Sequence, residues 1–104
     1  MNIDDVLAER SVRYGNFSDH ALIAQELQDV MRNAEIKIEN GQSLLTWNRL
    51  SMVQKQALTS IADKIARILS GDPHYDDNWR DIQGYAKLAL DNLHFQEPRL
   101  SEKV

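Results

Sequence analysis

Apolar residues recur at three- and four-residue steps along most of the chain, the spacing that places side chains on one face of an α-helix. The clearest pattern predicts a long central helix over residues 58 to 69, and a second predicts a helix over residues 79 to 93. Gly71 and Pro73 separate them, because glycine often closes a helix and proline cannot continue one. The connection is short and polar, so we expect these helices to pack antiparallel.

The apolar face of the later helix is expected to comprise Trp79, Ile82, Tyr85, Ala86, Ala89 and Leu93. Asp76, Asp77 or Asn78 can cap it, since acidic and amide groups suit a helix N-terminus. Gly84 lies inside this helix, where glycine costs about 1 kcal/mol relative to alanine. A close approach by a neighbouring helix or by a ligand would explain it, and packing is the commoner reason.

Two further helices are predicted in the N-terminal half. A short one spans residues 3 to 13, with Asn2 as its cap and Tyr14-Gly15 as its end. A longer one begins at Ser18 as its cap and continues to about Asn40-Gly41.

The chain between the second and the central helix is rich in glycine and polar residues. Residues 41 to 50 are expected to form an ordered loop or single turn, held on the core by their apolar side chains. Ser51 and Gln54 then form a capping-box pattern for the central helix. The predicted fold is all-α: a small bundle of about four helices, with a central antiparallel pair, in a single domain over residues 1–104.

The hydropathy and cysteine content of the chain limit the membrane and redox chemistry expected of it. Pro98 and its polar neighbours predict a tail that frays from about residue 96. No apolar run approaches the roughly 18 residues of a membrane span, and no leader pattern is visible, so no membrane partner is expected. Cysteine is absent, which excludes disulfides and thiol chemistry. The expected location is the cytoplasm.

Charge and histidine spacing exclude several functional classes. The 12 basic and 16 acidic residues give a net charge of -4, and no basic cluster stands out, so nucleic acid is not an expected partner. His20, His74 and His94 do not have the spacing of zinc ligands. Gly-rich phosphate loops are missing as well.

Carboxylates are the strongest remaining candidates for chemistry. Asp77 and Asp81 lie four residues apart on one helical face, and Asp63 lies on the helix expected to pack beside them. Carboxylates from neighbouring helices can hold Mg²⁺, a cation that prefers oxygen ligands and bridges to phosphates. Lys64, Arg67 and Arg80 are then candidates for phosphate contacts.

Structural roles compete with each of these assignments. The aspartates near residues 76 to 81 could serve only the helix terminus, and Asp63 with Arg67 could be a surface ion pair at i,i+4 spacing. The Lys64 stem could simply cover apolar surface. Trp79 and Tyr85 are better explained as core residues than as stacking platforms. Further acidic pairs on the second helix, expected on a solvated face, are Glu26 with Asp29 and Glu35 with Glu39.

Three segments, RYGNFSDHA, KIARILSGD and DNWRDIQGYAKLA, resemble the nucleotide-modification-associated family of small phage and prophage proteins. The resemblance covers about residues 13 to 90, and its last motif is the most specific. It implies an all-α fold distantly similar to MazG-like nucleoside triphosphate pyrophosphohydrolases, which bind Mg²⁺ through carboxylates on two helices. The positions it marks are Lys64, Arg67, Asp77, Asn78, Asp81 and Tyr85.

The chain departs from the MazG pattern, which has an E-E-x-x-E cluster on one helix and E-x-x-D on the next. Its central helix offers Asp63 alone, so Glu26, Glu35 or Glu39 would have to complete a metal site.

Two hypotheses follow. The first is a Mg²⁺-dependent nucleotide-binding or nucleotide-hydrolysing phage protein, with Asp63, Asp77 and Asp81 on the metal. Its nucleotide ligands would be Lys64, Arg67, Asn78, Arg80 and Tyr85. The second is a non-catalytic phage accessory module that binds a host or phage protein, with the charged cluster as a structural clasp in which Lys64 and Arg67 pair directly with the aspartates. A homodimer is a further hypothesis, because several apolar side chains fall outside the clear helical stripes.

Overall fold

The computed structural model describes residues 2–96 of the chain. The predicted all-α fold is confirmed: this part of the chain contains four α-helices and one small two-stranded sheet. The tail predicted from about residue 96, with Pro98, lies outside the described residues. In chain order the elements are α1 (Ile3–Tyr14), α2 (Phe17–Asn33), β1 (Glu35–Lys37), η1 (Glu39–Gly41), β2 (Ser43–Leu45), η2 (Thr46–Arg49), α3 (Met52–Ser70) and α4 (Asp76–Asp91).

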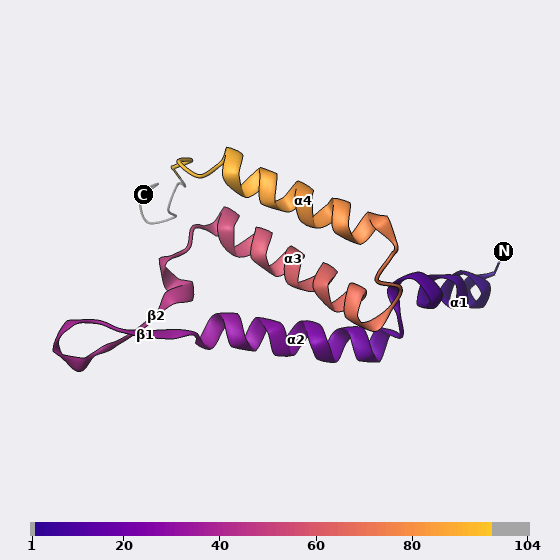
Figure 1. The fold of residues 1–104 in the computed structure, drawn as a ribbon, viewed down its shortest axis with the longest axis horizontal. Helices are drawn as coiled ribbons and strands as arrows, with labels where there is room; N and C mark the ends of the chain where they lie inside the picture. Colours follow the sequence, from indigo (N-terminus) through magenta and orange to yellow (C-terminus); the bar gives the residue numbers. More distant parts are fainter. Residues whose placement is uncertain (1, 97–104) are drawn as a thin grey trace, which may run out of the picture.

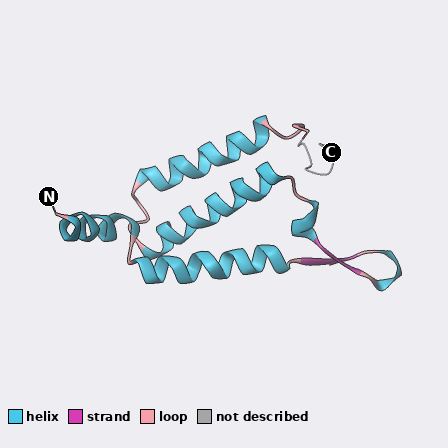
Figure 2. Ribbon diagram, turned by 180° about the vertical axis from the view of Figure 1, so that it is seen from behind, coloured by secondary structure: helices cyan, strands magenta, loops and turns pink. Residues whose placement is uncertain are grey.

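Helices α2, α3 and α4 lie side by side in one antiparallel layer, with α3 in the middle (Figure 1). Helix α1 projects from one end of this layer, and the β1–β2 hairpin projects from the other (Figure 2). The molecule is therefore elongated, with extents of 56 × 33 × 26 Å. The predicted antiparallel packing of the two C-terminal helices is confirmed by the close packing of α3 on α4.

Side-chain caps fix the starts of three helices. Asn2 accepts a hydrogen bond from the Asp5 backbone N–H at 2.9 Å, as predicted for α1. Ser51 and Gln54 form the reciprocal bonds of the predicted capping box of α3. The cap of α2 is Asn16 and not Ser18 as predicted, because the Ser18 N–H and hydroxyl both donate to the Asn16 side chain.

The start of α4 differs from the prediction. Its cap position is Tyr75, which makes no capping hydrogen bond through its side chain. Asp76 and Asp77 instead lie in the first turn, where their charge favours the positive end of the helix dipole.

The longer predicted helix ends earlier than expected. Helix α2 stops at Asn33, and residues 35–45 form an antiparallel hairpin in which Glu35 pairs with Leu45 and Lys37 with Ser43. The sequence Glu-Ile-Lys-Ile-Glu alternates with a period of two, which suits a strand. Asn40 and Gly41 follow with positive φ angles of 68° and 73°, the conformation that their residue types tolerate in a tight turn.

The interior of the helical layer is built from small side chains. Among the described residues the buried apolar ones are Ala24, Ala57, Ala62, Ala66 and Ile68. Alanines let helices approach closely, but they remove little apolar area from water. Trp79 is 54% exposed, so its predicted place in the core is wrong.

Close backbone contact occurs at Gly15 and Gly71 rather than at Gly84. A Cβ at Gly84 would meet nothing within 4 Å, so the predicted close approach there is wrong. A Cβ at Gly71 would lie 2.6 Å from the Gly15 backbone nitrogen, and one at Gly15 would overlap the carbonyl of Ser70. Gly15 also has a φ of 84°, which side-chain-bearing residues rarely adopt. The α1–α2 junction is thereby pressed against the end of α3.

Candidate functional site

An ion pair joins the middle of α3 to the first half of α4. Lys64 Nζ lies 2.9 Å from Asp81 Oδ2, and their side chains are 17% and 47% exposed. The lysine is thus largely withdrawn from water, and the aspartate reaches it from the neighbouring helix. This contact links a predicted phosphate ligand, Lys64, to a predicted metal ligand, Asp81.

A second network joins α2 to α3 through Asp63. One carboxylate oxygen lies 2.7 Å from Nε2 of the buried His20, and the other accepts from Arg67 Nε at 3.2 Å. Both oxygens of Asp63 are therefore occupied by protein groups. Together with the Lys64 pair, this network binds α2, α3 and α4 to one another at the level of one helical turn, because Asp63 and Lys64 are adjacent in the chain.

Asp77 is held by a tyrosine at the start of α4. The Tyr75 hydroxyl donates to Asp77 Oδ2 at 2.8 Å. This hydrogen bond, with a smaller contribution from Tyr14, raises the pKa of Tyr75 to about 12. The Tyr14 and Tyr75 rings pack edge to face at 5.5 Å, and Arg67 lies over Tyr14, 4.9 Å from the ring centroid. The end of α1 is thus connected to both α3 and α4.

The remaining predicted ligands are dispersed. Tyr85 lines a small polar cavity of about 270 Å³ with Lys64 and Asp63. Arg80 pairs with Asp76 at 3.0 Å on the outer surface of α4, with its side chain 74% exposed. Asn78 is fully buried, and neither polar atom of its side chain has a hydrogen-bond partner in the described part of the chain.

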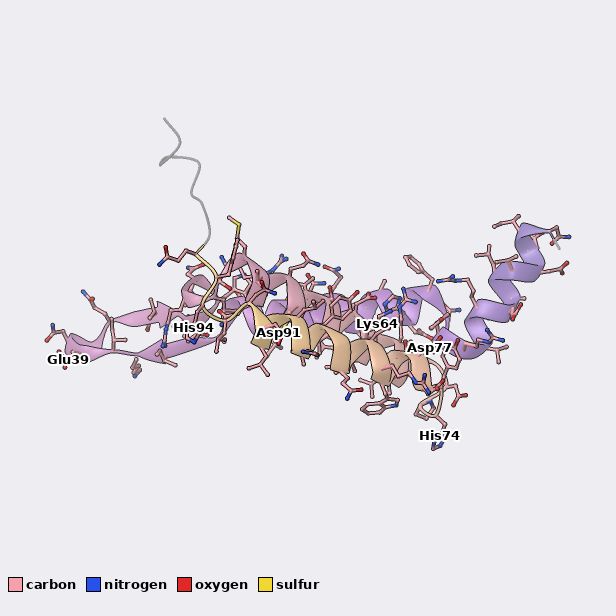
Figure 3. The ribbon with its side chains drawn as sticks, turned by 90° about the horizontal axis from the view of Figure 1, so that it is seen from above. Glu39, Lys64, His74, Asp77, Asp91 and His94 are labelled. Carbon is pink, nitrogen blue, oxygen red and sulfur yellow. The ribbon has the colours of Figure 1, made fainter. Side chains whose placement is uncertain are left out.

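The three predicted metal ligands, Asp63, Asp77 and Asp81, have separate partners in the structure. Each is bonded to a different basic or hydroxyl group, and residues 2–96 contain no group of three acidic, histidine or cysteine side chains placed to hold a metal ion. Glu39 lies at the hairpin tip, far from Lys64 and Asp77 (Figure 3). Binding of Mg²⁺ therefore stays a prediction.

His20 is the member of the cluster that sequence reasoning missed. Its position at four- and seven-residue spacing from Ala24 and Leu27 places it on the inner face of α2, and this spacing was visible in the sequence. A histidine buried on such a face needs a polar partner, which Asp63 provides.

The chain matches no protein-family model, no curated protein and no solved structure. The resemblance to small phage proteins therefore stays a prediction. No helix within the described ranges is long and apolar enough to cross a bilayer.

Proposed function

We propose that this protein is a non-catalytic interaction module, in which the charged cluster clasps the helices together and an exposed apolar stripe of α4 binds another protein. The observation that carries the proposal is that α4 keeps Trp79 and Leu90 54% and 67% exposed while the interior is filled by alanine. Large apolar side chains contribute most when they are buried, so their exposure indicates a surface completed by a partner.

The charged cluster supports the non-catalytic part of the proposal. Lys64 and Arg67 each contact an aspartate directly, and Asp63 uses both oxygens on protein groups. A metal at Asp63 or Asp81, or a phosphate at Lys64 Nζ, would first have to displace contacts of 2.7 to 3.2 Å. The simplest use of such contacts is structural, because each one spans two helices or fixes a side chain that does.

The binding surface, here called the α4 stripe, consists of Trp79, Ala86 and Leu90. Their i, i+7 and i+11 spacing places them on one face of α4. Exposed ion pairs line one edge of this face, Asp76 with Arg80 and Lys87 with Asp91. Polar groups at the edge of an apolar surface are usual in a protein interface.

The stripe fits a helical partner of a host or phage protein. Anchors on one face of an exposed helix are typical of recognition by an apolar groove or by a second helix. The competing occupant is the same stripe on a second copy of the chain. The molecular mass of the purified protein in solution distinguishes a homodimer from a monomer that binds a different protein. Light scattering should give the 12.0 kDa of one chain if the partner is a different protein.

The test compares two matched substitutions of exposed leucines. Leu90→Asp changes the stripe, and Leu22→Asp changes a leucine of α2 that is 60% exposed and lies off the stripe. Tagged variants are used as baits in lysate of an infected bacterial host. Proteins retained by the wild type and by Leu22→Asp, but lost with Leu90→Asp, would support the proposal. Equal recovery with both variants would overturn it.

Nucleotide hydrolysis, which the resemblance implies, stays a prediction. Its direct test is pyrophosphate release from deoxynucleoside triphosphates in the presence of Mg²⁺. Turnover that is lost in Asp81→Asn would contradict the non-catalytic part of the proposal.

A further inference from the structure

A cavity of about 390 Å³ lies where α1 meets the start of α2 and the end of α3. This volume falls within the range of small-molecule sites, about 300–1,000 Å³. Two arginines, Arg10 and Arg67, contribute to its wall, and none of its lining residues is acidic. In a chain with a net charge of -4, this is a local concentration of positive charge.

The two guanidinium groups are arranged around one aromatic ring. The Cζ atoms of Arg10 and Arg67 lie 5.2 and 4.9 Å from the centroid of Tyr14, so they are at most about 10 Å apart. Stacking on the ring restricts both side chains. Two such groups facing one space can donate several hydrogen bonds to the oxygens of a single anion.

Arg10 differs from the other arginines near the cavity in its partners. Arg13 pairs with Glu9, and Arg67 uses its Nε on Asp63. Arg10 forms no ion pair with any residue that the structure describes, and the terminal nitrogens of Arg67 make no hydrogen bond there. Arg10 therefore presents a charge that no described residue neutralises, and Arg67, although it pairs with Asp63 through Nε, presents terminal N–H groups that no described residue uses.

The walls of the cavity also offer an aromatic surface. Phe17 is 79% exposed, and its ring meets that of His20 edge to face at 6.0 Å. A largely exposed phenylalanine beside two arginines can stack on a planar ring of a ligand. Asn16 and Gly15 lie between these groups, and the contact of Gly15 with Gly71 fixes their backbone.

We infer that this cavity binds a small phosphate monoester that carries an aromatic ring, with Arg10 and Arg67 on the phosphate and Phe17 on the ring. A mononucleotide and an aryl phosphate share this chemistry. The site is separate from the α4 stripe and does not depend on the proposed function. Of the nucleotide ligands predicted from the sequence, only Arg67 lines this cavity, so the two sites are different.

The test is calorimetry of the full chain with four probes: inorganic phosphate, phenyl phosphate, adenosine monophosphate and adenosine. The two monoesters should bind at least tenfold more tightly than inorganic phosphate, and adenosine should not bind. Preference for one monoester distinguishes a nucleotide from another aryl phosphate. No binding of either monoester at millimolar concentration to a folded protein would overturn the inference.

Two substitutions assign the binding to the cavity. Arg10→Gln should weaken monoester binding at least tenfold without unfolding the protein, because Arg10 holds no ion pair in the described structure. Phe17→Ala should remove the preference for a monoester over inorganic phosphate. The matched control is Arg32→Gln, which changes an exposed arginine of α2 that does not line the cavity and should leave the affinity unchanged. Equal loss in Arg10→Gln and Arg32→Gln would show non-specific charge attraction and would overturn the assignment.

Discussion

Removing Asp81 from the Lys64–Asp81 pair should destabilise the protein more than removing Lys64. Lys64 is 17% exposed and Asp81 is 47% exposed, so removing the aspartate leaves a poorly hydrated cation, whereas removing the lysine leaves a half-hydrated anion. An unpaired buried charge costs about 3–5 kcal/mol and an exposed pair contributes about 0.2–1 kcal/mol. This pair lies between those limits.

The substitutions are Asp81→Asn, Lys64→Met and the double variant. Methionine keeps most of the apolar stem of Lys64. We expect Asp81→Asn to lower the free energy of unfolding by about 2 kcal/mol, and Lys64→Met by about 1 kcal/mol or less. The coupling energy of the cycle should be about 1 kcal/mol.

The assay is urea unfolding followed by far-ultraviolet circular dichroism at 25 °C. The control cycle uses Arg80 and Asp76, whose side chains are 74% and 61% exposed on the same helix. It should give a coupling energy of at most about 0.5 kcal/mol, which salt screens further. Equal coupling in the two cycles, or a smaller loss in Asp81→Asn than in Lys64→Met, would refute the clasp reasoning.

Three further predictions test other features of α4 and its start. Gly84→Ala should raise the free energy of unfolding by about 1 kcal/mol in the same assay, because the new Cβ meets nothing within 4 Å; a loss would indicate a contact at Gly84. Asn78→Leu should also stabilise, by about 1–2 kcal/mol, because it removes a buried amide without hydrogen-bond partners in residues 2–96; destabilisation would show that the amide is satisfied in solution. Absorbance titration should show one tyrosine ionising near pH 12, lost in Tyr75→Phe, because the bond to Asp77 raises the pKa of Tyr75 to about 12 from 10.0. The folded state then holds this proton longer than the unfolded state, so the contribution of Tyr75 is complete below pH 10 and falls as the pH rises to about 12. Ionisation near pH 10 would contradict this account.

The sequence predicted the helices well where local signals and apolar periodicity agreed. The capping box at Ser51 and Gln54 and the stop at Gly71 marked both ends of α3. The prediction of α2 was wrong beyond Asn33, because Ile38 continues the four-residue helical spacing from Ala34, whereas Ile36 and Ile38 also alternate as in a strand. The Asn40-Gly41 turn was the signal that should have decided between them.

The candidate site was predicted only in part. Motif spacing placed Asp63, Lys64 and Asp81 near one another, and the Lys64–Asp81 pair is consistent with that expectation. Their ionic partners depend on how α2 and α4 dock on α3, which spacing within one helix does not determine. The approach of Gly15 to Gly71 brings α1 to the end of α3, and this long-range contact has no local signature.

Photo-crosslinking from position 90 is the sharpest test of the α4 stripe as a binding surface. A photoreactive amino acid replaces Leu90 in one variant and the similarly exposed Leu22 in another, and each variant is irradiated in cells that express it. We expect a discrete crosslinked product with another protein from position 90 and none from position 22. No product from position 90, or the same products from both positions, would contradict the assignment of the α4 stripe as a binding surface.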